Sequence, residues 1–283
     1  MKPAPFAYER PSSLQAALQL LSANRGGARP LAGGQSLGPM LNLRLATPEL
    51  LVDISRLPEL RHAESTADGL TVGAGVCHAD FEDGRVEDVA QGLLRRVAGG
   101  IAYRAVRNRG TLGGSLAHAD PAADWPPVML ALGAEIEAVS ERGRRSIPAA
   151  EFVTGILSTA LQPEEVIAAV RIPRLAAGAR WGHCKFSCKP GDFGESIAVI
   201  VIDPARRTAR AVLAGHGQPP VLMRETAGVV AGLAIWSPGD APAVKNAVLA
   251  DLEAVGADKT LSRYELALHQ ASMSRAAREA CAS

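Results

Sequence analysis

The stretch of residues 106–124 constrains this chain more than any other, because it concentrates glycines beside hydroxyls and carboxylates. Glycines accept positive φ angles and let the backbone approach a ligand closely, which a Cβ atom would obstruct. Neighbouring hydroxyls and free backbone N–H groups suit a phosphate or pyrophosphate. The stretch predicts a phosphate-binding loop, with a tight surface turn as the alternative. The residues that carry the pattern are Gly110, Thr111, Gly113, Gly114 and Ser115.

Two carboxylates follow the glycines, Asp120 and Asp124, separated by a turn that Pro121 stiffens. An ionised carboxylate only accepts hydrogen bonds, so one placed just beyond a phosphate loop can bind the hydroxyls of a ribose or ribityl chain. Alternatively, Asp124 caps a helix that the following proline pair begins. His118 is either a proton shuttle or, in the favoured interpretation, a hydrogen-bonded structural histidine.

A second glycine stretch, residues 30–38, lies about 75 residues upstream of the first. Two such loops could grip two parts of one long dinucleotide-like ligand. The second stretch also contains Gly34-x-Ser36-x-Gly38, the pattern of a serine hydrolase nucleophile elbow. We favour coincidence, because an elbow normally tops a strand in mid-sheet and position 36 leaves too little chain before it.

The dinucleotide fingerprint Gly-x-Gly-x-x-Gly does not occur in this sequence. Gly73 and Gly75 begin one, but His78 stands where the third glycine belongs, and we expect no helix to open there. A Walker loop is also missing. A dinucleotide, if bound, is therefore not held by a Rossmann or P-loop site.

Composition favours an ordinary globular protein with 283 residues, 47% of them hydrophobic and 21% charged. A formal net charge of +1 gives no general reason to expect nucleic acid or an anionic membrane surface. The N-terminus lacks the apolar core of a signal peptide, and no apolar run approaches a membrane span. Four scattered cysteines fit a reducing compartment and complete no metal or cluster ligand set. These features predict a cytoplasmic protein with no metal site.

The first part of the chain, residues 1–56, is expected to form a small βαβ-like subdomain. A helix is predicted from Pro11 to near Asn24, because leucines recur along one face. Strands are predicted at 29–32 and at the apolar run 50–54.

The second part, residues 57–175, is expected to contain an antiparallel sheet and helices. A strand is predicted at 70–73, and period-2 alternation predicts strands at 134–139 and 166–172. Apolar residues at helical spacing predict an amphipathic helix over 83–98, ended by two glycines.

The third part, residues 176–283, is expected to be a small α+β domain. Residues 175–180 are the expected hinge before it. The elements predicted in it are strands at 197–202 and 208–214 and helices at 241–255 and 262–280.

Residues 185–193 open this third part with two lysines and two phenylalanines. They could bring a cation and an aromatic ring to a flat, partly anionic cofactor. The alternative is a solvated turn with Phe186 and Phe193 in the core.

Three motifs occur in order: Ala-Gly-Gly-Gln-Ser-Leu at 32–37, the glycine and aspartate stretch at 107–124, and Gly-Asp-Phe at 191–193. With them, the chain resembles the FAD-binding medium subunit of molybdenum hydroxylases, the group that contains xanthine and carbon monoxide dehydrogenases. The resemblance covers essentially the whole chain. It implies an α+β fold, with a two-subdomain FAD-binding domain of the PCMH or vanillyl-alcohol-oxidase-like type and a small C-terminal α+β domain.

The resemblance also implies which residues bind FAD. Residues 31–37 and 110–115 would wrap the pyrophosphate, Asp124 would contact the hydroxylated chain, and Ile101 and Phe193 would lie near the isoalloxazine. The full implied set is Leu31, Ala32, Gly33, Gly34, Gln35, Ser36, Leu37, Ile101, Gly110, Thr111, Leu112, Gly113, Gly114, Ser115, His118, Asp120, Asp124, Val166, Lys185, Asp192 and Phe193.

In that family, a large subunit hydroxylates substrate at a molybdenum cofactor, and two [2Fe–2S] clusters on a small subunit pass electrons to the flavin. The resemblance therefore implies an FAD-containing electron-transfer subunit within a dimer of heterotrimers, with no catalytic side chain of its own. The substrate and the terminal acceptor remain open. The alternatives are a serine hydrolase using Ser36 and a non-catalytic partner-binding protein.

Overall fold

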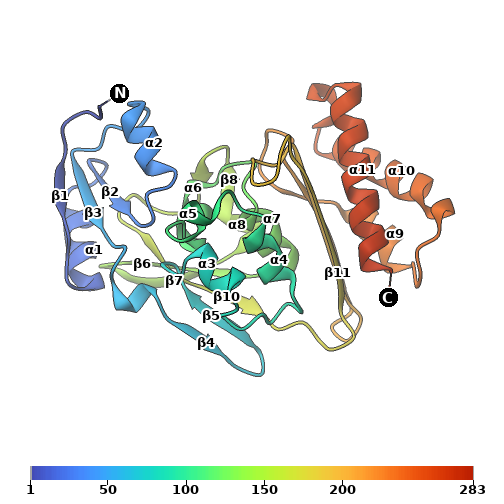
Figure 1. Ribbon diagram of the computed structural model, residues 1–283, viewed down its shortest axis with the longest axis horizontal. Coiled ribbons are helices and arrows are strands. Elements are labelled where there is room, and N and C mark those ends of the chain that lie inside the picture. Colours follow the sequence, from blue (N-terminus) through green and yellow to red (C-terminus); the bar gives the residue numbers. More distant parts are fainter. Residues whose placement is uncertain (1, 283) are drawn as a thin grey trace.

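Three main β-sheets follow one another along the longest dimension of the molecule in the computed structural model, which describes residues 2–282 (Figure 1). The first sheet comes from the N-terminal residues, the second from the middle of the chain, and the third lies beside the C-terminal helices. None of the helices in this range is both long and apolar enough to cross a membrane.

The first sheet is parallel, with strand order β1-β3-β2. Helix α1 packs its leucines into the core that this sheet shares with β10 of the second sheet, and Ser13 caps α1 by accepting a hydrogen bond from the Ala16 N–H at 3.2 Å. The predicted helix and both predicted strands are confirmed. The bounds are β1 Ala7–Glu9, α1 Leu14–Ala23, β2 Ala28–Leu31, α2 Leu37–Asn42, β3 Leu50–Asp53 and the short 3-10 helix η1 Pro58–Leu60; α2 was not predicted.

The second sheet is antiparallel, with strand order β4-β5-β10-β6-β7. Its three predicted strands are confirmed. Alternate apolar residues of each strand face the core, and β10 is also buried on its other face, against the first sheet. The bounds are β4 Ala63–Ser65, β5 Gly69–Gly73, β6 Glu135–Ser140, β7 Gly143–Pro148 and β10 Val166–Pro173, with α8 Ala149–Phe152 and the hairpin β8 Val153–Gly155 and β9 Ser158–Thr159 between them.

Short helices fill the chain between β5 and β6. Helix α7, Trp125–Leu132, is buried at every position and packs against both the second and the third sheet. The other helices here are α3 His78–Glu82, α4 Leu93–Gly99, α5 Arg104–Arg107 and α6 Leu112–His118.

Two sequence predictions in this region are wrong. The helix predicted over 83–98 is confined to α4, because Gly84 (φ +71°), Gln91 (φ +56°) and Gly92 (φ +97°) take left-handed conformations that interrupt a helix. The apolar residues at helical spacing are nonetheless buried, as irregular chain packed on the core. The absence of a helix after Gly75 is also wrong, since α3 begins at His78.

The third sheet is antiparallel, with order β11-β12-β13-β14. Strand β12 is buried along its whole length, because one of its faces meets α7 and the other meets the C-terminal helices. The strands and helices predicted here are confirmed. The bounds are β11 Arg180–Phe186, β12 Ser196–Asp203, β13 Thr208–Ala214, β14 Val221–Leu222, α9 Arg224–Ala231, η2 Pro238–Asp240, α10 Ala241–Ala254, η3 Asp258–Thr260 and α11 Arg263–Ala280.

Candidate functional site

A cavity of about 1020 Å³ lies where the two glycine loops meet β11 and the loop that follows it. Residues from all three parts of the chain line it. Nearly all of the residues singled out in the sequence are among them. The two exceptions are Leu31, whose carbonyl accepts from the Ile54 N–H, and Leu112, which is fully buried in the core.

The two glycine loops pack directly against each other. A Cβ atom on Gly33 would lie 2.0 Å from the carbonyl oxygen of Arg109, and a Cβ on Gly113 would lie 2.4 Å from the Cβ of Ala74. The Arg109 Nε also donates to the Gly33 carbonyl at 3.3 Å. These glycines are therefore required by the approach of one chain segment to another, whatever the cavity holds.

Gly114 has a different environment. A Cβ atom added there would meet only the Thr111 Oγ1, at 2.9 Å. Thr111 caps α6, since its Oγ1 accepts from the Gly114 N–H at 3.0 Å. Gly114 lines the cavity, and no backbone atom would lie against a Cβ added to it. A side chain at this position would therefore extend from the cavity wall.

Free backbone donors are concentrated in the first glycine loop. Between residues 2 and 282, the backbone N–H groups of Gly33, Gly34, Gln35 and Ser36 have no hydrogen-bond acceptor. In the second loop the corresponding groups are already bonded, to acceptors that include Val76, Ala74 and Thr111: Gly110, Leu112, Gly113, Gly114 and Ser115. The anion-binding capacity of the site therefore lies mainly in residues 33–36.

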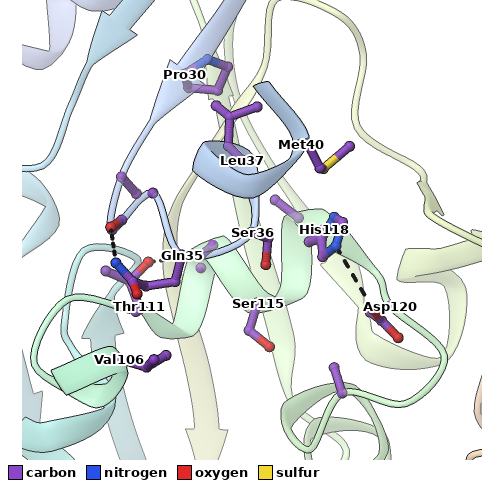
Figure 2. Close-up of a pocket in the computed structure, with 18 of the residues that line it drawn as sticks. Pro30, Gln35, Ser36, Leu37, Met40, Val106, Thr111, Ser115, His118 and Asp120 are labelled. Atoms are coloured by element: carbon purple, nitrogen blue, oxygen red, sulfur yellow. Dashed lines mark hydrogen bonds and ion pairs between the residues drawn. The ribbon is translucent and has the colours of Figure 1, made fainter. Parts of the chain in front are cut away.

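Two serines, Ser36 on the first glycine loop and Ser115 on α6, line the cavity (Figure 2). Neither hydroxyl has a hydrogen-bond partner within the described part of the chain. Ser36 has a relaxed backbone (φ −101°, ψ −50°) rather than the strained turn of a nucleophile elbow. No base among residues 2–282 is hydrogen-bonded to the Ser36 hydroxyl, so the structure gives the serine hydrolase alternative no support.

His118 lies at the same end of the cavity, with its Nε2 at 3.9 Å from the Asp120 Oδ2 (Figure 2). Gln35 folds back on its own loop and donates from Nε2 to the Gly33 carbonyl at 3.1 Å. Above them, Pro30, Leu37 and Met40 form an apolar wall. This end of the cavity therefore combines polar groups with an apolar slot.

A buried ion pair joins Asp124 to Lys185, with 2.9 Å between Oδ2 and Nζ. Burial raises the pKa of the Asp124 carboxyl to about 6, although the neighbouring ammonium acts to lower it. The other oxygen, Oδ1, is buried and has no hydrogen-bond partner among residues 2–282. Asp124 occupies the N-cap position of α7 but makes no capping hydrogen bond, so the alternative role of helix cap is not realised.

The third group of lining residues comes from the loop after β11. Gly191 takes φ +87°, and a Cβ atom on it would lie 2.8 Å from the carbonyl oxygen of Ala102, so the loop rests on the segment beside Ile101. Phe193 is 66% exposed, which makes the alternative that placed it in the core wrong. Asp192 and Val166 also line the cavity.

Several lining residues were not singled out as ligands from the sequence. Ala74, Gly75 and His78 line the cavity beneath the second glycine loop, and residues 45–48 line it beyond α2. Helix α2 was not predicted from the sequence, and residues 45–48, which connect it to β3, were therefore assigned no role. The broken Gly-x-Gly-x-x-His pattern at 73–78 was the available signal for the other group.

Known proteins resemble this chain over most of its length. Residues 4–175 match the family model for the FAD binding domain in molybdopterin dehydrogenase. The 6-hydroxypseudooxynicotine dehydrogenase complex subunit alpha of Paenarthrobacter nicotinovorans is 36% identical over 234 residues, covering 81% of this chain and 79% of that protein. The carbon monoxide dehydrogenase medium chain of Hydrogenophaga pseudoflava is 36% identical over 208 residues, covering 74% of this chain and 72% of that protein. Both names denote parts of multi-subunit enzymes.

Solved structures agree with these relatives. Carbon monoxide dehydrogenase from Hydrogenophaga pseudoflava superposes with a TM-score of 0.89 at 32% identity, covering 99% of this chain and 98% of that one. Quinoline 2-oxidoreductase from Pseudomonas putida 86 superposes with a TM-score of 0.88 at 32% identity, covering 99% of this chain and 98% of that one. The predicted fold is confirmed. The chain belongs to the FAD-binding medium subunits of the molybdenum hydroxylases, a family of oxidoreductase flavoproteins.

Proposed function

We propose that this chain binds FAD in the cavity between its glycine loops and passes electrons from a small [2Fe–2S] subunit to a terminal acceptor. A large molybdenum-cofactor subunit would hydroxylate the substrate, and the three chains would assemble as a dimer of heterotrimers. When bound, FAD supplies the redox chemistry, and the protein supplies binding, orientation and electrostatics. The cytoplasmic location remains a prediction.

The observation that carries this proposal is the orphaned, buried Oδ1 of Asp124. A buried polar atom without a partner costs free energy, so such atoms usually mark a ligand or an ordered water. The hydroxyl of a ribityl chain would donate to this oxygen, while the other carboxylate oxygen stays bonded to Lys185.

The pyrophosphate is proposed to lie over residues 33–36, whose N–H groups are open. The serine hydroxyls of Ser36 and Ser115 are free to donate to it. The second glycine loop would give the site its shape rather than its donors, since its own N–H groups are already bonded. Ile101, Val166, Lys185, Asp192 and Phe193 would surround the isoalloxazine.

The first test is a visible absorption spectrum of the purified full chain before and after incubation with FAD. A flavin spectrum near one FAD per chain without iron–sulfur absorption supports the proposal. If the chain remains colourless after incubation, and also with its partner subunits present, the proposal is wrong. Labelling of Ser36 by a fluorophosphonate probe would instead revive the hydrolase alternative.

The placement of the pyrophosphate is tested with Gly114→Val. The added side chain meets only Thr111 Oγ1, so we expect the fold to persist and flavin retention to be lost. The matched control is Gly228→Val on α9, where an added Cβ meets nothing within 4 Å and lies far from the cavity lining. Normal flavin content in Gly114→Val would contradict the placement.

The domain division at 1–56, 57–175 and 176–283 is kept as a proposal. Each part contributes one of the three main sheets, which supports it. The expected hinge at 175–180 is tied down at Leu175, whose N–H donates to the Val89 carbonyl, and at Ala176, whose N–H donates to Asp203. Limited proteolysis with cleavage concentrated in 175–180 would favour the division, and uniform resistance there would oppose it.

A further inference from the structure

His78 lines the cavity, and the proposed FAD contacts give it no role. It is the first residue of α3, and its backbone N–H donates to the Gly110 carbonyl at 2.9 Å. The adjacent Cys77 forms an isolated antiparallel bridge with Thr111. The histidine is therefore fixed by its backbone to the second glycine loop.

The tautomer of His78 follows from its neighbour Trp125. The indole Nε1 can only donate, and it lies 3.0 Å from the His78 Nδ1. Nδ1 must accept that hydrogen bond, so it carries no proton. In the neutral ring the proton is on Nε2. Trp125 is itself fully buried, with Phe81 packed against it at 5.0 Å between ring centroids, so the donor cannot swing away.

The ring is neutral under ordinary conditions. Burial, with a smaller effect from the nearby Arg107 guanidinium, lowers the pKa of His78 to about 4. The side chain is only 5% exposed. His78 thus presents an uncharged N–H, held in one orientation.

The Nε2 atom of His78 lies beside Gly110, in the second glycine loop that lines the cavity. A Cβ atom on Gly110 would lie 2.8 Å from Nε2, so only glycine leaves room for the ring edge. Nε2 has no hydrogen-bond partner in the part of the chain that the structure describes. A fixed donor without an acceptor, beside a cavity, is a group built for a ligand atom.

We propose that His78 is a cofactor-binding residue that donates from Nε2 to an acceptor oxygen in the phosphate and sugar linker of FAD, with Trp125 as the positioning residue that sets its tautomer. This inference rests on the proposed FAD site. It gives the third position of the interrupted glycine pattern a role that a glycine could not fill.

Two substitutions of His78 separate its two nitrogens. In His78→Asn, the shorter amide keeps an oxygen that can accept from Trp125 but has no group at the position of Nε2. In His78→Gln, the longer amide brings an N–H near that position but removes the Nδ1 acceptor. FAD affinity is measured by flavin fluorescence on the full chain, and folding by thermal unfolding.

We expect His78→Asn to bind FAD about tenfold more weakly at near-normal thermal stability, the loss of one hydrogen bond to a ligand. His78→Gln should stay within about threefold of the wild-type affinity but unfold at lower temperature, because a buried indole N–H loses its acceptor. Trp125→Phe should weaken FAD binding in the wild-type background and not in the His78→Asn background.

Nitrogen-15 NMR of the histidine rings in the FAD-free chain reads the tautomer directly. A protonated Nδ1 on His78 would overturn the inference before any cofactor is added. If the wild-type chain binds FAD and His78→Asn binds it equally well, the inference is wrong while the proposed function stands. If the wild-type chain and its complex bind no FAD, the proposed function fails and this inference with it.

Discussion

Replacing Lys185 tests the buried ion pair between Lys185 and Asp124, both of which line the cavity. At 2.9 Å and an effective dielectric constant of about 20, two unit charges attract by roughly 6 kcal/mol. Desolvation of both groups offsets much of this attraction, but removal of one partner leaves an uncompensated buried charge. We expect Lys185→Met to lower the free energy of unfolding by about 3–5 kcal/mol at about pH 8.

The pH dependence of the destabilisation follows from the direction of the Asp124 pKa shift. The pKa of Asp124 is raised in the folded chain to about 6, from 3.8. The favourable contribution of the protonated carboxyl is therefore fully present below the unfolded pKa and lost as the pH rises through about 6. In Lys185→Met the carboxylate loses the ammonium that lowered its pKa, so the penalty is largest at about pH 8 and small at about pH 5, where Asp124 is protonated.

Urea unfolding of the FAD-free chain at both pH values measures the effect. The control is the double variant Lys185→Met/Asp124→Leu, which replaces the pair with apolar groups and should recover wild-type stability. Equal destabilisation at the two pH values, or no recovery in the double variant, would refute the reasoning.

Two further substitutions test how the loops are held. Gly33→Ala puts a Cβ atom 2.0 Å from the Arg109 carbonyl oxygen, so we expect it to lower the free energy of unfolding by at least about 2 kcal/mol and to abolish flavin retention. The control is Gly38→Ala, whose added Cβ meets nothing within 4 Å and should have neither effect. Arg107→Met removes the donor to the carbonyls of Ile101 and Ala102 (2.9 and 2.8 Å), and we expect it to raise the flavin dissociation rate several-fold in stopped-flow fluorescence. An unchanged rate in Arg107→Met would mean that the segment is held by its other contacts.

Periodic segments were readable from the sequence because local pattern and burial agree in them. The continuous apolar run in β12 matches a strand that is buried on both faces. The helical spacing of apolar residues in α1 and α11 matches the one face of each helix that the fold buries. The helix prediction over 83–98 was wrong before α4 because the spacing of apolar residues does not report backbone conformation. Gln91 takes a positive φ that no residue propensity indicates.

The site was readable only in part. The sequence singled out the two glycine loops, and both line the cavity. Glycine is required at Gly33 and Gly113, however, because other chain segments approach them closely rather than because of a ligand. The pairing of Asp124 with Lys185 joins residues 61 positions apart, and nothing local in the sequence specifies it. His78 was noticed as a departure from a motif, yet its tautomer depends on Trp125, 47 positions away.

Helix α7 has no solvent face, since the second sheet lies on one of its sides and the third sheet on another. A fragment that ends at residue 175 would leave one side of this apolar helix exposed to water, although the matched family model ends there. We therefore expect such a fragment to aggregate, and residues 57–214 to unfold in a single cooperative step.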